Sequence, residues 1–402
     1  MNKRFHLKYD YPKQNELLYV IALFFEILAM IIDLSTIKNT YSFIDFNTIT
    51  KTLRYIGYVI IFIKIINTAY TKDELLLQIA VVAVVGANAL VIGRSQFLAF
   101  MFVYGMKDLD FEYVVKRICI WINVAMILTI LLAYAGVIQN WTYSIGNRMR
   151  ASLGYRYPSV TTSVILYAWT TLCYVLKNKL KLWHVIVMEL LNIVQYQITD
   201  SRTGTAIIAL MLVVFYLIRY FKDKKIDLYF RRILVHAVWI SAAVSIACVL
   251  FYNPDIQLWA ILNKFVSNRI VLSVQAIQKY GIHLFGMSIQ WIGFGGLGYL
   301  YDALPGEYNF VDCSYIKILL DNGIVFFLMI IAGFTYVSSR AAKKGNTYFC
   351  LALAVVAVYS MIEPRLCQMD YNPFLLTLGT AIELKRQKNE ENSSEYQTVI
   401  NQ

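Results

Sequence analysis

Long apolar runs recur along this chain, and short polar segments separate them. About 20 helical residues span the hydrocarbon core of a bilayer, so runs near that length predict transmembrane helices. The pattern predicts an all-α polytopic integral membrane protein with about 12 transmembrane helices. The expected helices are 17–33, 53–70, 75–92, 97–106, 118–136, 159–176, 183–199, 205–220, 233–252, 323–339, 347–361 and 373–384.

The helices are expected to form one transmembrane domain over residues 1–384. Residues 385–402 form a polar tail that we expect to be disordered and cytoplasmic. A long loop near 253–322 precedes the tenth predicted span, and it carries apolar residues at helical spacing followed by a glycine-rich stretch. This composition predicts short helices lying on or dipping into the outer leaflet.

Composition supports a membrane protein. Hydrophobic residues make up 59% of the chain and charged residues only 15%, against about 25% charged in soluble domains. The net charge of +12 would suggest nucleic-acid binding in a soluble protein. Here the charge lies mainly in short loops, so membrane topology explains it and no nucleic acid is expected.

The positive-inside rule places both termini in the cytoplasm, because basic segments such as 177–181, 222–225 and 340–344 then face inward. On the outer side, arginine outnumbers lysine. Topology requires only positive charge, whereas planar arginine binds phosphate through two parallel hydrogen bonds. The arginine excess therefore favours an anionic ligand outside, with chance in a small sample as the alternative.

The external segments hold the candidate site residues. They are Arg94 in GRSQ, Arg150 and Arg156 in NRMRASLGYRYPS, Arg202 in DSRTGTA, Arg269 and His283 in the long loop, and Asp312 and Tyr315 in DCSYIKILL.

Each candidate also has a purely structural interpretation. Arg94 and Arg202 lie in short turns, where an arginine either anchors the helix at the interface or binds an anion. Arg269 opens a helical segment and is a surface charge on the simpler interpretation. A lone histidine such as His283 is more often structural. Asp312 is either a helix cap or a general base.

The sequence provides no pattern for a metal or a cofactor, and we expect neither. P-loop, GxSxG and HExxH motifs are absent, and no acidic pair on the outer face suggests a divalent metal. The stretch GFGGLG at 293–298 has no surrounding βαβ unit, so it does not predict a nucleotide site.

Four short motifs resemble those of the Wzy-type polysaccharide polymerases, relatives of the O-antigen ligases. The first, RASLGYRYPS, is similar to an Arg-x-x-x-Gly-x-x-x-Pro-Asn stretch through Arg150, Gly154 and Pro158, with Ser159 in place of Asn. The second motif is the Ser201-Arg202 turn. The third is Arg269 followed by a helix and the pair Phe285-Gly286. In the fourth, the positions of a ligase motif are occupied by Asp312, Cys313, Gly323 and Phe326.

The ligases carry a histidine in the slot that Asp312 occupies here. Capsule-type polymerases often show Asp-Asn-x-Tyr there, and Asp312 with Tyr315 fits that variant. The closing segment EPRLCQMDYNPFLLTLG also looks like the end of Gram-positive capsule polymerases. The resemblance therefore favours a polymerase over a ligase, with either Asp312 or His283 as the base.

The resemblance implies a GT-C-like glycosyltransferase in the bacterial plasma membrane. Such an enzyme joins undecaprenyl-diphosphate-linked oligosaccharide repeat units, as donor and acceptor, into capsular polysaccharide or exopolysaccharide. Implied catalytic residues are Asp312, Arg269 and His283, and implied substrate-binding residues are Arg150, Arg202, Arg94, Tyr315 and Arg156. A chain-length regulator and a flippase of the same pathway are the implied partners.

Two rivals remain. A flippase for the same lipid-linked unit also needs about 12 spans, but it should carry its basic residues within the helices and needs no long external loop. The second rival is an O-antigen-ligase-type transferase, which the aspartate at position 312 disfavours.

Overall fold

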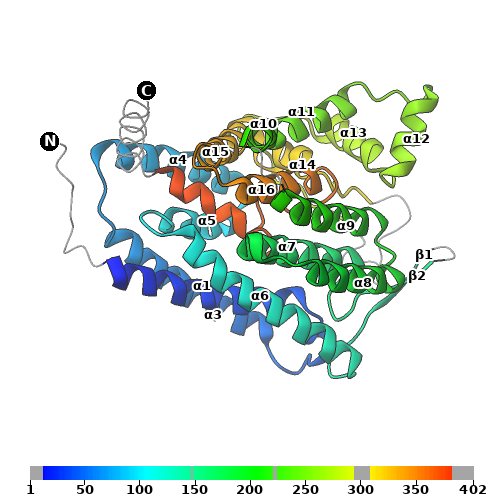
Figure 1. The fold of residues 1–402 in the computed structure, drawn as a ribbon, viewed down its shortest axis with the longest axis horizontal. Helices are drawn as coiled ribbons and strands as arrows, with labels where there is room; N and C mark the ends of the chain where they lie inside the picture. The colour runs from blue at the N-terminus through cyan, green and yellow to red at the C-terminus, as the bar shows by residue number, and fades with distance from the viewer. Residues whose placement is uncertain (1–11, 146–147, 221–223, 294–307, 383–402) are drawn as a thin grey trace.

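The structure is a computed structural model, and it describes residues 12–145, 148–220, 224–293 and 308–382. It is an assembly of helices with one short β-hairpin (Figure 1). The main helices are α1 (Pro12–Leu34), α3 (Phe46–Ile66), α4 (Lys72–Ile92), α5 (Ser95–Gly105), α6 (Phe111–Tyr134), α7 (Pro158–Leu176), α8 (Leu182–Thr199), α9 (Arg202–Leu217), α10 (Lys224–Val235), α11 (Ala237–Leu250), α15 (Gly323–Lys343), α16 (Thr347–Tyr359) and the 3-10 helix η4 (Pro373–Ile382).

Every apolar segment predicted from the sequence is helical. Two differ in form: the segment predicted at 233–252 is a pair of helices, α10 and α11, bent by 45° at His236, and 373–382 is a 3-10 helix. Six helices of the described chain are long and apolar enough to cross a membrane, or seven if the bent pair counts as one span. The protein is therefore an all-α, multi-pass membrane protein.

Several helices begin with conventional caps. The Asp45 side chain accepts a hydrogen bond from the Thr48 backbone N–H at the start of α3. At α4, Thr71 and Glu74 form a reciprocal capping box. These contacts satisfy backbone N–H groups that the first helical turn leaves without partners.

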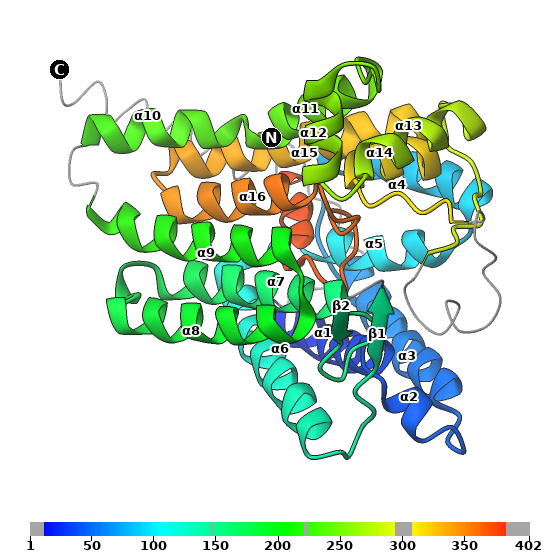
Figure 2. The same cartoon turned by 90° about the vertical axis from the view of Figure 1, so that its right-hand side faces the viewer.

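Helix α7 forms the centre of the molecule. Its most apolar window is 72% buried inside the protein, whereas the corresponding windows of the other long apolar helices are at most 39% buried. Helix α7 packs against α6, α8, α9 and α16, and Figure 2 shows it between α9 and α8. The outer faces of α4, α6 and α8 carry exposed Leu, Ile and Val side chains, as expected for surfaces in contact with lipid.

The described part of the long loop contains three helices: α12 (Gln257–Phe265), α13 (Arg269–Tyr280) and α14 (Ser314–Asp321). The helical spacing at residues 270–277 is thus confirmed as a helix. The glycine-rich stretch falls largely within 294–307, outside the described residues. The prediction that this stretch lies at the outer leaflet therefore stays a prediction.

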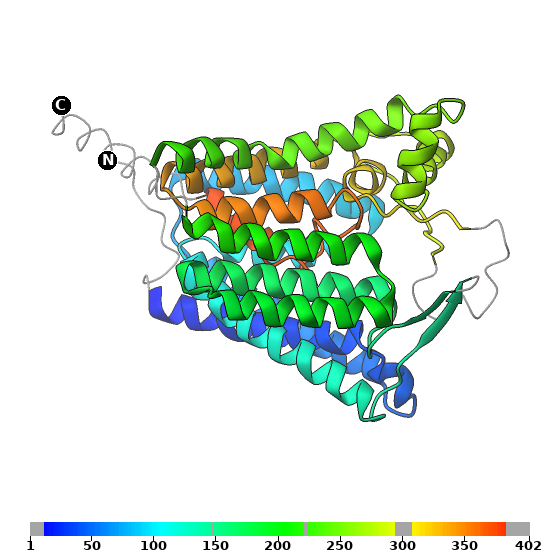
Figure 3. The same cartoon turned by 45° about the vertical axis from the view of Figure 1, so that its right-hand side comes forward.

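A β-hairpin follows α6, and the sequence pattern did not predict it. Strands β1 (Thr142–Ile145) and β2 (Arg148–Ala151) pair antiparallel, with Tyr143 opposite Arg150. The hairpin, α12 and α13 lie at the same end of the helix bundle (Figures 1 and 3). This end also holds the polar cluster described next.

Candidate functional site: a buried acid–arginine cluster

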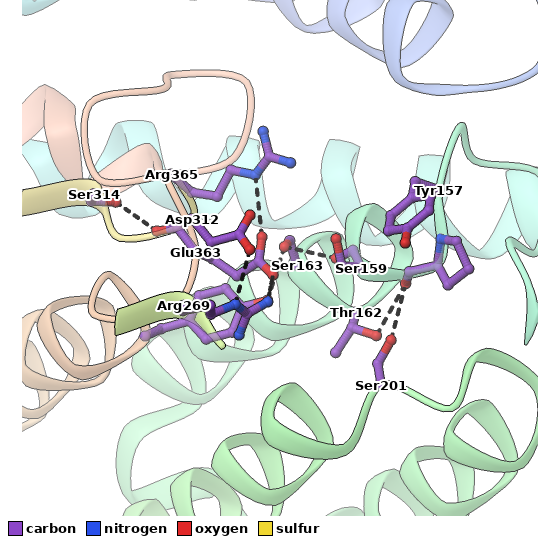
Figure 4. Close-up of polar contacts among 12 residues, drawn as sticks. Tyr157, Ser159, Thr162, Ser163, Ser201, Arg269, Asp312, Ser314, Glu363 and Arg365 are labelled. Carbon is purple, nitrogen blue, oxygen red and sulfur yellow. Dashed lines mark hydrogen bonds and ion pairs between the residues drawn. The ribbon is translucent and has the colours of Figure 1, made fainter. Parts of the chain in front are cut away.

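Four charged residues from three distant segments form what we call the acid–arginine cluster: Arg269, Asp312, Glu363 and Arg365. Arg269 Nε lies 3.0 Å from Asp312 Oδ2, and its Nη2 lies 3.1 Å from Glu363 Oε1. Arg365 Nε lies 3.9 Å from Glu363 Oε2. Figure 4 shows Arg269 reaching both carboxylates. The guanidinium of Arg269 therefore links three segments: the start of α13, the residues just before α14 and the loop after α16.

Burial differs within the cluster. The Glu363 side chain is 5% exposed, whereas Asp312 is 21% exposed. Burial raises the pKa of Glu363 to about 7, against the opposing effect of Arg269 and with a further rise from Asp312. Burial alone would lower the pKa of Arg269, but Asp312 and Glu363 together raise it above its ordinary value. Asp312 is thus the carboxylate that solvent and a ligand reach more easily.

Ser314 holds the cluster's backbone together. Its hydroxyl donates to the Glu363 carbonyl at 2.6 Å and accepts from the Leu366 N–H at 3.1 Å (Figure 4). Its own N–H donates to the Ser360 carbonyl at 2.8 Å. These three bonds fasten the loop after α16 to the first turn of α14, beside Asp312. They hold Glu363 close to Asp312, so that both carboxylates accept from Arg269.

Arg150 on β2 approaches from the hairpin. Its Nε donates to the Thr199 carbonyl at 2.8 Å and its Nη2 to Ser201 Oγ at 3.2 Å. Its guanidinium also lies 5.5 Å from the centre of the Tyr157 ring. The charge of Arg150 lowers the pKa of Glu363, so the hairpin arginine is within electrostatic range of the cluster.

Tyr308 lies near the same groups from the long loop. Burial raises the pKa of its hydroxyl above the ordinary value, and the negative charge of Asp312 adds to the rise. Arg269 opposes it. The cluster therefore has a phenol beside it as well as charged groups.

The remaining predicted arginines lie elsewhere. Arg202 is the first residue of α9, with its side chain 68% exposed and Nε 3.4 Å from Asp200. Arg94 is exposed in the turn between α4 and α5. Arg156 is half-buried, and its backbone N–H donates to the Leu34 carbonyl at 3.3 Å. Within the described residues, no hydrogen bond or ion pair joins these three to the cluster.

Two other candidates are also separate from the cluster. His283 is exposed and lies beyond the far end of α13 from Arg269, a helix about 18 Å long by its 12 residues. Its ring Nε2 is 3.1 Å from the Tyr280 carbonyl. Tyr315 is fully buried, and its hydroxyl donates to the Ala357 carbonyl at 2.9 Å. Its side chain therefore packs within the bundle, between α14 and α16.

Sequence reasoning missed Glu363 and Arg365 as site residues. The available signal was the GluProArg triplet in an otherwise apolar C-terminal region. Nothing in that triplet indicated that Glu363 pairs with Arg269, 94 positions earlier, because the pairing depends on how the loop after α16 folds back.

Among the described residues, no group of three or more His, Cys, Asp or Glu side chains has the arrangement of a metal site. The cluster instead places carboxylates and guanidinium groups side by side. Such an arrangement can bind an anion through arginine and accept a proton through a carboxylate. No family model, curated protein or solved structure matches the chain.

Proposed function

We propose that the protein is a polysaccharide polymerase of the bacterial plasma membrane. It would join undecaprenyl-diphosphate-linked repeat units on the outer face, and its topology would comprise 12 spans with both termini in the cytoplasm. The observation that carries the proposal is Arg269, held between Asp312 and Glu363 at one end of the bundle.

The motifs that suggested the family also meet in space. Arg150 bonds to Ser201, and Arg269 pairs with Asp312. Gly286 packs against the Asp321–Gly323 turn so closely that an added Cβ would lie 1.9 Å from the Asp321 carbonyl oxygen. Motifs far apart in the chain thus form contacting pairs, which supports a common role for them.

The chemistry follows from the charges. The acceptor hydroxyl oxygen attacks the anomeric carbon of the donor, and the bond from that carbon to the phosphate oxygen breaks. Negative charge grows on the departing diphosphate, where arginine stabilises it most. The cations that we expect to stabilise this charge are Arg269, Arg150 and Arg365.

The proton of the acceptor hydroxyl needs a base. Asp312 is the more exposed carboxylate of the cluster, so we assign it that role. Glu363 is the second carboxylate that pairs with Arg269. Tyr315 is left out of the proposed site because it is buried within the bundle, and His283 because α13 separates it from Arg269. Arg94, Arg156 and Arg202 remain candidates for holding lipid or sugar phosphate farther out.

The test uses purified protein in liposomes with a lipid-diphosphate-linked repeat unit, and the products are separated on a gel. A ladder of repeat-unit multiples that Asp312→Asn abolishes would support the polymerase. Transfer of the lipid between leaflets without a ladder would instead support a flippase. Addition of finished chains to a lipid acceptor would support a ligase.

A further inference from the structure

Helix α12 has its apolar and polar sides reversed. Within α12, all of whose residues are described, Asn263 is the only buried side chain, at 8% exposed. Phe265, by contrast, is 75% exposed. The exposed apolar side chains recur at the spacing of one helical face, and we call them the α12 stripe: Leu258, Ile261, Leu262 and Phe265. The helix therefore turns an apolar face away from the protein.

The protein alone does not account for a helix at this place. Isolated helices shorter than about 12 residues are marginal in water, and packing of an apolar face supplies most helical stability in proteins. Helix α12 has nine residues, and the described part of the chain leaves the α12 stripe uncovered. A further apolar surface is therefore needed to stabilise α12.

The joint between α12 and α13 fixes the direction of the stripe. Ser267 and Asn268 have left-handed backbone angles, with φ of +56° and +64°. The Asn268 N–H donates to the Asn263 carbonyl at 2.7 Å. The Asn263 side chain donates to Asn268 Oδ1 at 3.1 Å and accepts from the Val271 N–H at 3.2 Å. Asn263 thus ties α12 to the first turn of α13, so the stripe cannot turn inward without breaking these bonds.

The surface next to the stripe already faces lipid. Helices α10 and α11 together count as one membrane span, and α11 carries exposed Ile240 and Val244. Exposed apolar side chains continue from the end of α11 through the following turn: Leu250, Phe251 and Ile256. Figure 3 shows α12 lying across the end of the bundle rather than along it. Helices that lie in the membrane interface have this orientation.

Residues beside the stripe favour lipid over a protein partner. The ring of Trp259 lies edge-on to that of Tyr252, with ring centres 6.2 Å apart, and such residues gather at the membrane–water boundary. Lys264 is exposed on the polar side of α12, and the helix contains no Asp or Glu. A lysine beside an apolar face is attracted to the phosphate of lipid head groups.

We infer that α12 is an interfacial anchor, and that the α12 stripe enters the lipid leaflet at this end of the bundle. The stripe continues the lipid-facing surface of α11, while Asn263 holds the helix to α13. The inference concerns a lipid surface alone and does not rest on the proposed polymerase activity.

The test places a nitroxide spin label on full-length protein in lipid nanodiscs. Oxygen concentrates in hydrocarbon and a water-soluble nickel chelate stays outside it, so the ratio of their collision rates with the label reports depth. Ile261→Cys carries the label on the stripe. Val244→Cys is the lipid-facing reference on α11, and Met149→Cys is the water-facing reference on β2, where Met149 is 70% exposed. We expect the oxygen-to-nickel ratio at position 261 to match that at 244 and to exceed that at 149 several-fold.

The unchanged protein measures labelling of native cysteines, and two further variants test the stripe itself. With the label at position 261, Phe265→Asp places a charge in the stripe and should lower the ratio several-fold, toward that at 149. Lys264→Gln changes the polar side of the same helix and should leave the ratio unchanged.

Three results would overturn the inference. A ratio at position 261 equal to that at 149 would place α12 in water. A label at 261 that neither reagent reaches would mean that a protein surface covers the stripe. A ratio that Phe265→Asp leaves unaltered would mean that the stripe does not hold α12 in lipid; should that variant not fold, the comparison of positions 261, 244 and 149 decides.

Discussion

At the scale of single residues, Arg269 is the side chain that joins the two carboxylates of the acid–arginine cluster. Its guanidinium bonds to Asp312 through Nε and to Glu363 through Nη2. A lysine has one charged nitrogen and cannot present two donor nitrogens in this fixed planar geometry. The shape of the side chain is therefore expected to matter as much as its charge.

We predict that Arg269→Lys lowers polymer formation by roughly 10-fold or more, since it removes at least one charge-assisted hydrogen bond of about 1.5–3 kcal/mol. Membrane expression should stay near the wild-type level. The measurement is the product ladder per amount of folded protein. Arg232→Lys is the matched control, because Arg232 lies exposed on α10, outside the proposed site, so the same change of side-chain shape should leave the ladder unaltered. Equal ladders from both variants would remove Arg269 from the proposed site.

Glu363 leads to a prediction about pH. Its pKa in the folded protein is raised to about 7 by burial, above the ordinary value near 4.3. Between these two pH values, the folded protein binds a proton on Glu363 that the unfolded chain has lost. Protonated Glu363 therefore stabilises the folded state fully below about pH 4.3, and this contribution is lost as pH rises through 7. We expect Tm of the wild type to fall between pH 5 and 8.

The check is the same Tm series with Glu363→Gln, which cannot ionise and should show a smaller fall over this range. Asp312→Asn serves as the comparison, since it removes the other carboxylate that pairs with Arg269. If Glu363→Gln follows the wild type across the whole range, Glu363 does not titrate there.

At the scale of elements, the junction between α14 and α15 is the tightest backbone contact near the long loop. Gly286 has φ +81° and Gly323 has φ +83°. An added Cβ on Gly286 would lie 1.9 Å from the Asp321 carbonyl oxygen, and one on Gly323 would lie 2.3 Å from the Gly286 nitrogen. Both residues therefore need glycine for the backbone angle and for space.

We predict that Gly286→Ala destabilises the protein much more than Gly136→Ala. Gly136 also has a positive φ, +71°, but nothing lies within 4 Å of a Cβ placed there. The control should cost about 1–2 kcal/mol from backbone strain alone. Gly286→Ala adds a clash with backbone atoms. Comparable Tm values for the two variants would contradict the close packing of this turn.

Asn322 fastens the same junction to α4 and α5. Its Nδ2 donates to Asn88 Oδ1 at 2.6 Å and to Gln96 Oε1 at 2.5 Å, while Asn88 Nδ2 donates to the Phe285 carbonyl. The sequence showed the Phe285-Gly286 pair and Gly323 as separate motifs. Their contact could not be predicted, because these polar partners lie more than 190 positions apart.

At the scale of the whole molecule, hydropathy was sufficient to locate the helices, because each apolar segment predicted from the sequence is helical in the structure. The hairpin at Thr142–Ala151 escaped prediction, since two four-residue strands leave too short an alternating pattern. The pairing of Arg269 with Asp312 was also not predicted, although both residues were candidates. Periodicity reports which face of a helix is buried, but not which distant loop packs on it.

The proposed topology predicts which loops chemical probes reach. Asp255 is exposed after α11, and Lys179 is exposed in the turn between α7 and α8. With 12 spans and cytoplasmic termini, Asp255→Cys should react with a membrane-impermeant maleimide on intact cells. Lys179→Cys should react only after permeabilisation. The unchanged protein measures the background from native cysteines, and the reverse pattern would invert the proposed orientation.

The double pairing of Arg269 also sets a threshold for any anion that enters. An incoming anion must displace Asp312, Glu363 or both from the guanidinium before it can form hydrogen bonds with both Nε and Nη2. Singly charged anions such as chloride cannot compensate for that exchange, whereas a diphosphate brings several oxygens and more charge. On the proposed function, the carboxylates would act as resident competitors, which keep abundant small ions away from Arg269 and leave it to a rare, highly charged ligand.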